Sequence, residues 1–100
     1  MPLIYDPAAR TELIEAAAYY EECRPGLGEA FLGEVEGAID RLSRDPLRWR
    51  KIGGRFRRCL VRQFPYGIIY AVEDPEIFVA AIMHLRRKPG YWRGRLRPHA

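Results

Sequence analysis

The 100-residue sequence contains few of the residues that build metal sites and disulfide frameworks. There are only two cysteines, Cys23 and Cys59, and two histidines, His84 and His99. The two cysteines are too few and too isolated for a disulfide framework or a metal site, and with only two histidines besides, a structural or catalytic zinc site is not expected. We therefore predict no metal and no other cofactor. Both thiols are expected to be reduced and buried in a cytoplasmic protein.

Long hydrophobic runs are also missing. No apolar stretch approaches the roughly 20 residues that a membrane span needs. The opening segment, MPLIYDPAAR, has neither the basic start nor the apolar stretch of a signal peptide. Hydrophobic residues make up 48% and charged residues 30% of the chain, which is typical of a globular domain. We expect one domain over residues 1–100 and no contact with a membrane.

Charge is distributed unevenly along the chain. Residues 1–45 contain four Arg and ten Asp or Glu, whereas residues 46–100 contain thirteen Lys or Arg and three Asp or Glu. The first part therefore has a net charge of −6 and the second of +10, within a total of +4. This segregation indicates that the second part meets an anionic partner.

The acidic part is patterned as an extended segment at 2–5 and two helices. Asp6-Pro7 predicts a helix start, because Asp caps helices and Pro is tolerated at their first position, and this helix runs to about residue 24. After the turn RPGLG, a second helix is expected at about 28–44. Both have apolar positions at helical spacing, which predicts a helical hairpin with an apolar inner face.

Three β-rich runs follow, at 56–64, 66–73 and 77–85, separated by breaks of hairpin length. The middle run is apolar at nearly every position, as expected for a central strand. The order β-α-α-β-β-β predicts an α+β domain, with the helical hairpin packed on one face of a mostly antiparallel sheet and the other face open. The expected core residues are Leu13, Ala17, Tyr20, Phe31, Val35, Leu42, Ile69, Val79 and Ile82.

The segment HLRRKPGYW (84–92) gathers cations and aromatic rings after the last strand. We expect Arg86, Arg87 and Lys88 to emerge from the sheet edge and Pro89-Gly90 to turn the chain. Cationic side chains bind phosphate, and Tyr91 and Trp92 offer flat faces for stacking. Two further residues are expected to contribute, since Arg58 and Arg62 lie four apart in a predicted strand and so share a face.

Simpler interpretations apply to each of these residues alone. A charge run is usually a solvated face, and for Trp92 packing over the core is favoured above stacking. His84 is equally consistent with a structural hydrogen bond and with a role at a site. Only His84 and Tyr91 are placed to transfer protons near the cations, so the groups needed for metal-free RNA cleavage are sparse.

Three segments together resemble the RelE/ParE superfamily of type II toxin–antitoxin toxins: RLSRDP, RRCLVRQFPYGIIYAVED and AAIMHLRRKPGYW. The resemblance covers nearly the whole chain. It implies a β-α-α-β-β-β toxin that is neutralised by an antitoxin encoded alongside it. RelE-like members cleave messenger RNA on the ribosome, whereas ParE-like members poison DNA gyrase.

The resemblance is closer to the ParE-like branch, because Gly67 stands where RelE-like toxins have a catalytic Arg in the central strand. The expected function is growth inhibition by binding an essential target, most simply DNA gyrase. The alternatives are a ribosome-dependent messenger RNA endonuclease and a non-toxic member that only binds its partner. The catalytic candidates are Arg62, Arg87, Tyr91 and His84; the target-binding candidates are Arg58, Arg86, Arg87, Lys88, Tyr91 and Trp92.

The expected partner is an antitoxin with a flexible, acidic and amphipathic C-terminal segment. The basic part of the chain would attract the acidic segment, which would fold on binding. Part of its contact area is expected on the helical hairpin, where acidic side chains leave room for Arg or Lys beside an apolar stripe.

Overall fold

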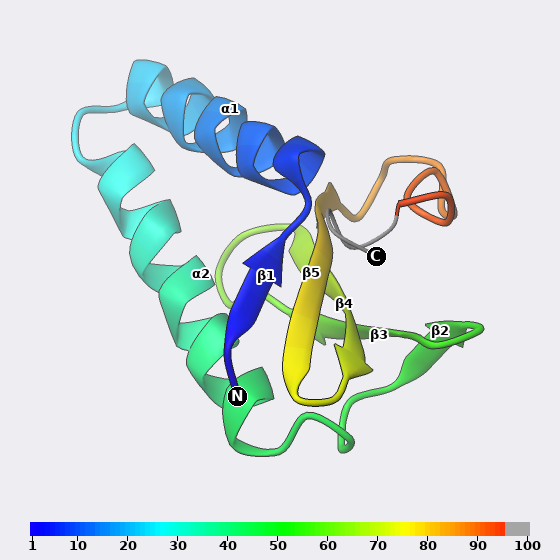
Figure 1. Ribbon diagram of the computed structural model, residues 1–100. Helices are drawn as coiled ribbons and strands as arrows, with labels where there is room; N and C mark the ends of the chain where they lie inside the picture. The colour runs from blue at the N-terminus through cyan, green and yellow to red at the C-terminus, as the bar shows by residue number, and fades with distance from the viewer. Residues whose placement is uncertain (96–100) are drawn as a thin grey trace.

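A helical hairpin and a five-stranded sheet make up the computed structural model, which describes residues 1–95 (Figure 1). The elements in chain order are β1 (Leu3–Tyr5), α1 (Pro7–Cys23), α2 (Leu27–Arg44), β2 (Lys51–Gly53), β3 (Phe56–Leu60), β4 (Tyr66–Glu73) and β5 (Glu76–His84). The strand order is β1-β5-β4-β3-β2; β1 is parallel to β5, and the other pairs are antiparallel. The predicted α+β architecture is confirmed.

Local sequence explains the ends of the helices. The Asp6 carboxylate accepts a hydrogen bond from the Ala8 N–H at 2.8 Å, as the capping pattern predicted. Between the helices, Gly26 has a φ of 88°, which favours glycine. The Glu21 carboxylate accepts from the N–H groups of Gly26 and Gly28, so α1 caps α2. A Cβ at Gly28 would lie 2.5 Å from a carbonyl oxygen of α1, so the helices meet closely there.

The main core lies between the hairpin and the sheet. The predicted core residues Phe31, Val35, Leu42, Val79 and Ile82 are buried in it. Leu13, Ala17 and Tyr20 are only partly buried, because α1 turns its small residues Ala9 and Ala16 to the sheet and these larger side chains flank the contact. The alanines allow α1 to lie close to β5.

A second core lies on the opposite face of the sheet, which the sequence predicted to be open. Residues 85–95, the C-terminal arm, cover this face. The indole of Trp92 is 1% exposed and meets the Phe56 ring edge-on at 4.9 Å between centroids. The preference for packing at Trp92 is confirmed, and the open face is wrong. The residues of this core are Phe56, Ile69, Ala71, Phe78, Ala80, Ala81, Met83 and Trp92.

A β-bulge in β5 divides its side chains between the two cores. Ile69 of β4 pairs with Ala81 and Tyr70 pairs with Val79, so Ala80 is the additional residue. As a result, Val79 and Ile82 both face the helices although they are three residues apart.

The strand expected at 56–64 ends at Leu60. Gln63 has a φ of 69°, and the chain turns before Pro65. Arg58 therefore lies on a strand while Arg62 lies in an exposed loop, and the prediction that they share a strand face is wrong. The short strand β2 was not predicted, because its three residues, Lys51, Ile52 and Gly53, give no strand pattern.

Cys59 is buried, but Cys23 is exposed, and both are free. The expectation of two buried thiols is wrong for Cys23, since the whole turn at residues 21–26 faces solvent. His99 lies outside the described residues. Neither helix of the described chain is long and apolar enough to span a membrane.

Replacing Trp92 with Ala should reduce the free energy of unfolding by about 3–5 kcal/mol, because it removes the largest side chain of the second core. Urea denaturation followed by circular dichroism measures this. Leu47, which is 64% exposed, provides the control: Leu47→Ala should change stability by no more than about 0.5 kcal/mol. A loss below about 1 kcal/mol for Trp92→Ala would contradict the second core.

Candidate functional site

The candidate site begins where β1 ends beside β5. β1 pairs only with Ile77–Val79, so β5 continues past it without a strand neighbour on that side in the described chain. The first turns of α1 lie beside this part of β5 (Figure 1). Here the Glu12 carboxylate, whose side chain is 13% exposed, accepts a hydrogen bond from the Ile82 N–H at 3.0 Å. A side chain thus replaces the missing strand partner.

The C-terminal arm returns to the same carboxylate through Arg95. Its guanidinium donates to both Glu12 oxygens, at 3.1 and 3.0 Å, and to the Ala80 carbonyl oxygen at the bulge, at 2.8 Å. The Arg95 side chain is 18% exposed. Burial opposes its charge, but the hydrogen bond and the negative charge of Glu12 outweigh this and raise the pKa of Arg95. Bidentate, partly buried pairs of this kind are strong and geometrically specific.

Arg87 and Tyr91 complete the cluster. One Arg87 nitrogen lies 3.4 Å from a Glu12 oxygen, and its guanidinium carbon lies 3.6 Å from the Tyr91 ring centroid. The guanidinium carbon of Arg95 is 5.1 Å from the same centroid. The aromatic ring thus contacts both cations. The Arg87 side chain remains 53% exposed, so it can still meet a partner.

Tyr91 is a poor proton donor at neutral pH. Burial, followed by the negative charge of Glu12, raises the pKa of its hydroxyl to about 12, although both neighbouring guanidinium groups lower it. General acid catalysis is most effective when the pKa lies near the working pH. The geometry gives Tyr91 an aromatic contact role more readily than a catalytic one.

His84 lies at the end of β5, where its Nδ1 accepts a hydrogen bond from the Arg86 N–H at 3.1 Å. Its ring meets Tyr66 edge-on at 5.1 Å. His84 and Arg87 both line a small surface pocket of about 190 Å³ that also includes Glu12. Arg62 does not line this pocket, so the structure brings together His84, Arg87 and Tyr91 but not the fourth catalytic candidate.

The other target-binding candidates are distributed around the arm. Arg86 and Lys88 are exposed. The Arg58 side chain passes over Gly67 of β4, where a Cβ added to Gly67 would lie 3.0 Å from the Arg58 Cγ and Cδ atoms. Gly67 therefore leaves space for the Arg58 stem on the second face. Trp92 is buried and presents no stacking face to a target.

Glu12, Arg93 and Arg95 were not among the predicted site residues. Arg93 stacks on Trp92 at 5.7 Å, and its guanidinium would touch a Cβ at Gly53, so the arm reaches from α1 to the β2–β3 turn. A sequence signal existed for Glu12, which lies three residues after Ala9 and four before Ala16, on the buried face of α1. Arg95 had no such signal.

The described chain contains no group of three His, Cys, Asp or Glu residues that could hold a metal ion. The cluster of Glu12, Arg87, Tyr91 and Arg95 instead forms a fixed, partly exposed cationic surface.

Comparisons with known proteins agree with this fold. A family model described as the ParE toxin of type II toxin–antitoxin system, parDE, matches residues 3–89. Among solved structures, a chain of the chromosomal ParDE TA system from P. aeruginosa has a TM-score of 0.75. It is 15% identical over 85% of this chain and 96% of that chain, a level at which the likeness shows the fold alone. The curated proteins give no match.

The tyrosine pKa values predict alkaline instability. The pKa of Tyr91 in the folded protein, about 12, lies above its ordinary value of 10.0, so the stability that this group contributes is complete below pH 10 and is lost as the pH rises towards 12. Tyr91→Phe should make the fall in unfolding free energy between pH 10 and about 12 shallower. Urea titrations across this range test it, and an unchanged slope would contradict the placement of Tyr91.

Proposed function

Because the chain belongs to the family of ParE toxins of type II toxin–antitoxin systems, we propose that it arrests growth by binding DNA gyrase, in its complex with DNA. The observation that carries the proposal is the C-terminal arm, a cationic surface fixed on a second core, with Arg87 half exposed near its beginning. A fixed surface loses little conformational entropy on binding, which favours inhibition by binding.

The charge of the arm suits a target that contains DNA. Arg86, Arg87, Lys88 and Arg93 are exposed on it, and residues 46–100 have a net charge of +10. Cationic side chains contact phosphates and draw an anionic complex to the protein at long range. Binding should therefore weaken as salt increases.

A second candidate is ribosome-dependent cleavage of messenger RNA. It is favoured by the pocket of about 190 Å³ that His84 and Arg87 share. It is disfavoured by the Tyr91 pKa of about 12 and by the use of His84 Nδ1 as a structural acceptor. Binding therefore remains the better supported function.

Arg87→Ala should weaken inhibition of gyrase supercoiling about tenfold or more, because it removes a half-exposed cation that Glu12 and Tyr91 hold in place. In a plot of log affinity against log salt concentration, the slope for this variant should also be shallower by about one unit. Arg24→Ala, which removes an exposed cation from the α1–α2 turn, is the control and should inhibit like the parent chain. Supercoiling assays with purified gyrase at several salt concentrations provide both measurements.

Tyr91→Phe separates the alternatives. It should leave gyrase inhibition nearly unchanged, because the ring is kept. If the protein instead cuts ribosome-bound messenger RNA and Tyr91→Phe slows the cutting, the endonuclease function is supported. If neither gyrase nor messenger RNA is affected and induction does not stop growth, the chain is a non-toxic member that only binds its partner.

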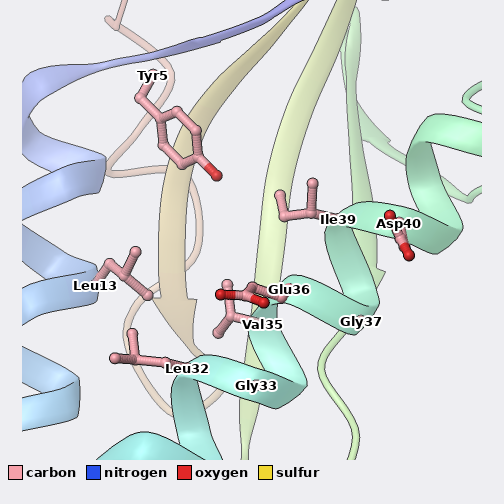
Figure 2. A pocket seen from close by; sticks show the side chains of 9 residues that line it. All are labelled: Tyr5, Leu13, Leu32, Gly33, Val35, Glu36, Gly37, Ile39 and Asp40. Atoms are coloured by element: carbon pink, nitrogen blue, oxygen red, sulfur yellow. The ribbon is translucent and has the colours of Figure 1, made fainter.

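The antitoxin expected for this family would dock on the helical hairpin. A groove of about 590 Å³ lies between β1, α1 and α2 (Figure 2). Tyr5, Leu13 and Leu32 give it an apolar floor and wall, and Glu36 and Asp40 add acidic groups along α2 (Figure 2). These features suit an amphipathic partner segment with apolar side chains flanked by Lys or Arg.

Two glycines of α2 line this groove and leave space in it because they have no side chain. Gly33 and Gly37 lie one turn apart on α2, and an added Cβ at Gly33 would meet no atom within 4 Å. A larger side chain at Gly33 would therefore fill space that the partner would use, at no steric cost to the fold.

Gly33→Leu should reduce affinity for the antitoxin encoded alongside the toxin about tenfold or more while gyrase inhibition is unchanged. Stability should stay the same or rise, since Gly is a poor helix former. Titration calorimetry measures the affinity, and binding of the parent chain should show a heat-capacity decrease. Ile14→Ala, at an exposed position of α1 outside the groove, is the control. Equal affinities for all three proteins would exclude this groove.

A further inference from the structure

One carboxylate group holds three parts of the chain together. Each Glu12 oxygen has two donors: Oε1 accepts from the Ile82 N–H and from Arg95, and Oε2 lies against Arg95 and Arg87. These donors come from β5, from the end of the arm and from its exposed beginning. Figure 1 shows the start of α1 beside the point where the chain leaves β5.

Removal of the Glu12 charge would affect Arg95 most. The Arg95 side chain is 18% exposed and would lose its ion-pair partner, while it would keep the neutral Ala80 carbonyl oxygen as a hydrogen-bond acceptor. A partly buried cation without its counter-charge is costly, so the end of the arm would move to solvent. Trp92 lies three residues earlier, and its carbonyl oxygen accepts a hydrogen bond from the Arg95 N–H at 3.0 Å, so movement of Arg95 would disturb the segment that holds the indole.

The exposed beginning of the arm, at Arg87, also depends on the Glu12 carboxylate. Arg87 is half exposed, and its guanidinium is held by Glu12 on one side and the Tyr91 ring on the other. Without Glu12, both the Arg87 side chain and the ring beneath it become mobile. A target would then have to order them on binding, which lowers affinity.

We propose that Glu12 is a positioning residue for target binding: it holds Arg87 and Tyr91 in the arrangement that meets the target and keeps Trp92 in the second core, without touching the target itself. This role rests on the proposed inhibition of gyrase. A positioning role predicts that loss of the Glu12 charge weakens binding. A purely electrostatic role predicts the opposite, because removing a negative charge beside the arm would strengthen binding to an anionic complex.

Glu12→Gln is the direct test, since it removes the charge and keeps the size. Two readouts are compared: inhibition of gyrase supercoiling, and acrylamide quenching of Trp92 fluorescence in a Trp49→Phe background without gyrase. Glu12→Gln should raise quenching severalfold and weaken inhibition about tenfold. Glu22→Gln, an equal charge change at an exposed position near the end of α1, should alter neither.

Arg95→Lys provides a test with no change in net charge. Lysine cannot form the bidentate pair with Glu12, so quenching should rise and inhibition should fall, by less than in Glu12→Gln. This variant keeps the proposal testable if Glu12→Gln fails to fold, which circular dichroism would show.

The outcomes are distinct. Inhibition by Glu12→Gln equal to or stronger than that of the parent chain, with Trp92 still protected, overturns the positioning role and leaves the proposed function standing. Failure of the parent chain to inhibit gyrase overturns the proposed function, and with it the role of Glu12 towards gyrase, whatever the quenching shows.

Discussion

The ion pair between Glu12 and Arg95 joins the first helix to the end of the described chain, and the surface proposed for target binding depends on it. It forms where β1 has ended and the bulge in β5 leaves the Ala80 carbonyl oxygen and the Ile82 N–H available to side chains. Charged groups thus complete the sheet edge with hydrogen bonds that a longer β1 would otherwise make. The backbone groups at this edge of β5 also fix the positions of the Glu12 and Arg95 side chains.

This contact also explains how a 100-residue chain supports two cores. The hairpin covers one face of the sheet, and the arm covers the other with the buried side chain of Trp92 and the partly buried ring of Tyr91. Small residues of the bulge, Ala80 and Ala81, belong to the core that receives the indole. The cations on the arm therefore stand on packed apolar structure, while the groove lies on the helical hairpin, in another part of the molecule (Figure 1). Target and antitoxin are thus proposed to use separate surfaces.

Local rules predicted the elements well and the tertiary site poorly. Asp6-Pro7, the hairpin glycines and the apolar runs act within a few residues, so the helices and the central strand could be predicted from sequence. The end of β3 at Leu60 depends on a turn conformation, and the burial of Trp92 depends on which surface the arm meets. Glu12 and Arg95 are separated by most of the chain, so no spacing rule could pair them. Arg87 and Tyr91 were identified because they are close in sequence.

The C-terminal arm, residues 85–95, is proposed to form a fixed basic surface. ¹⁵N relaxation of the isolated protein measures this directly, residue by residue. The account predicts order parameters for residues 87–95 close to those of β5, about 0.85 as in rigid backbone. Values below about 0.6 across these residues would contradict it, because a solvated tail would then replace the fixed surface on which the proposed inhibition depends.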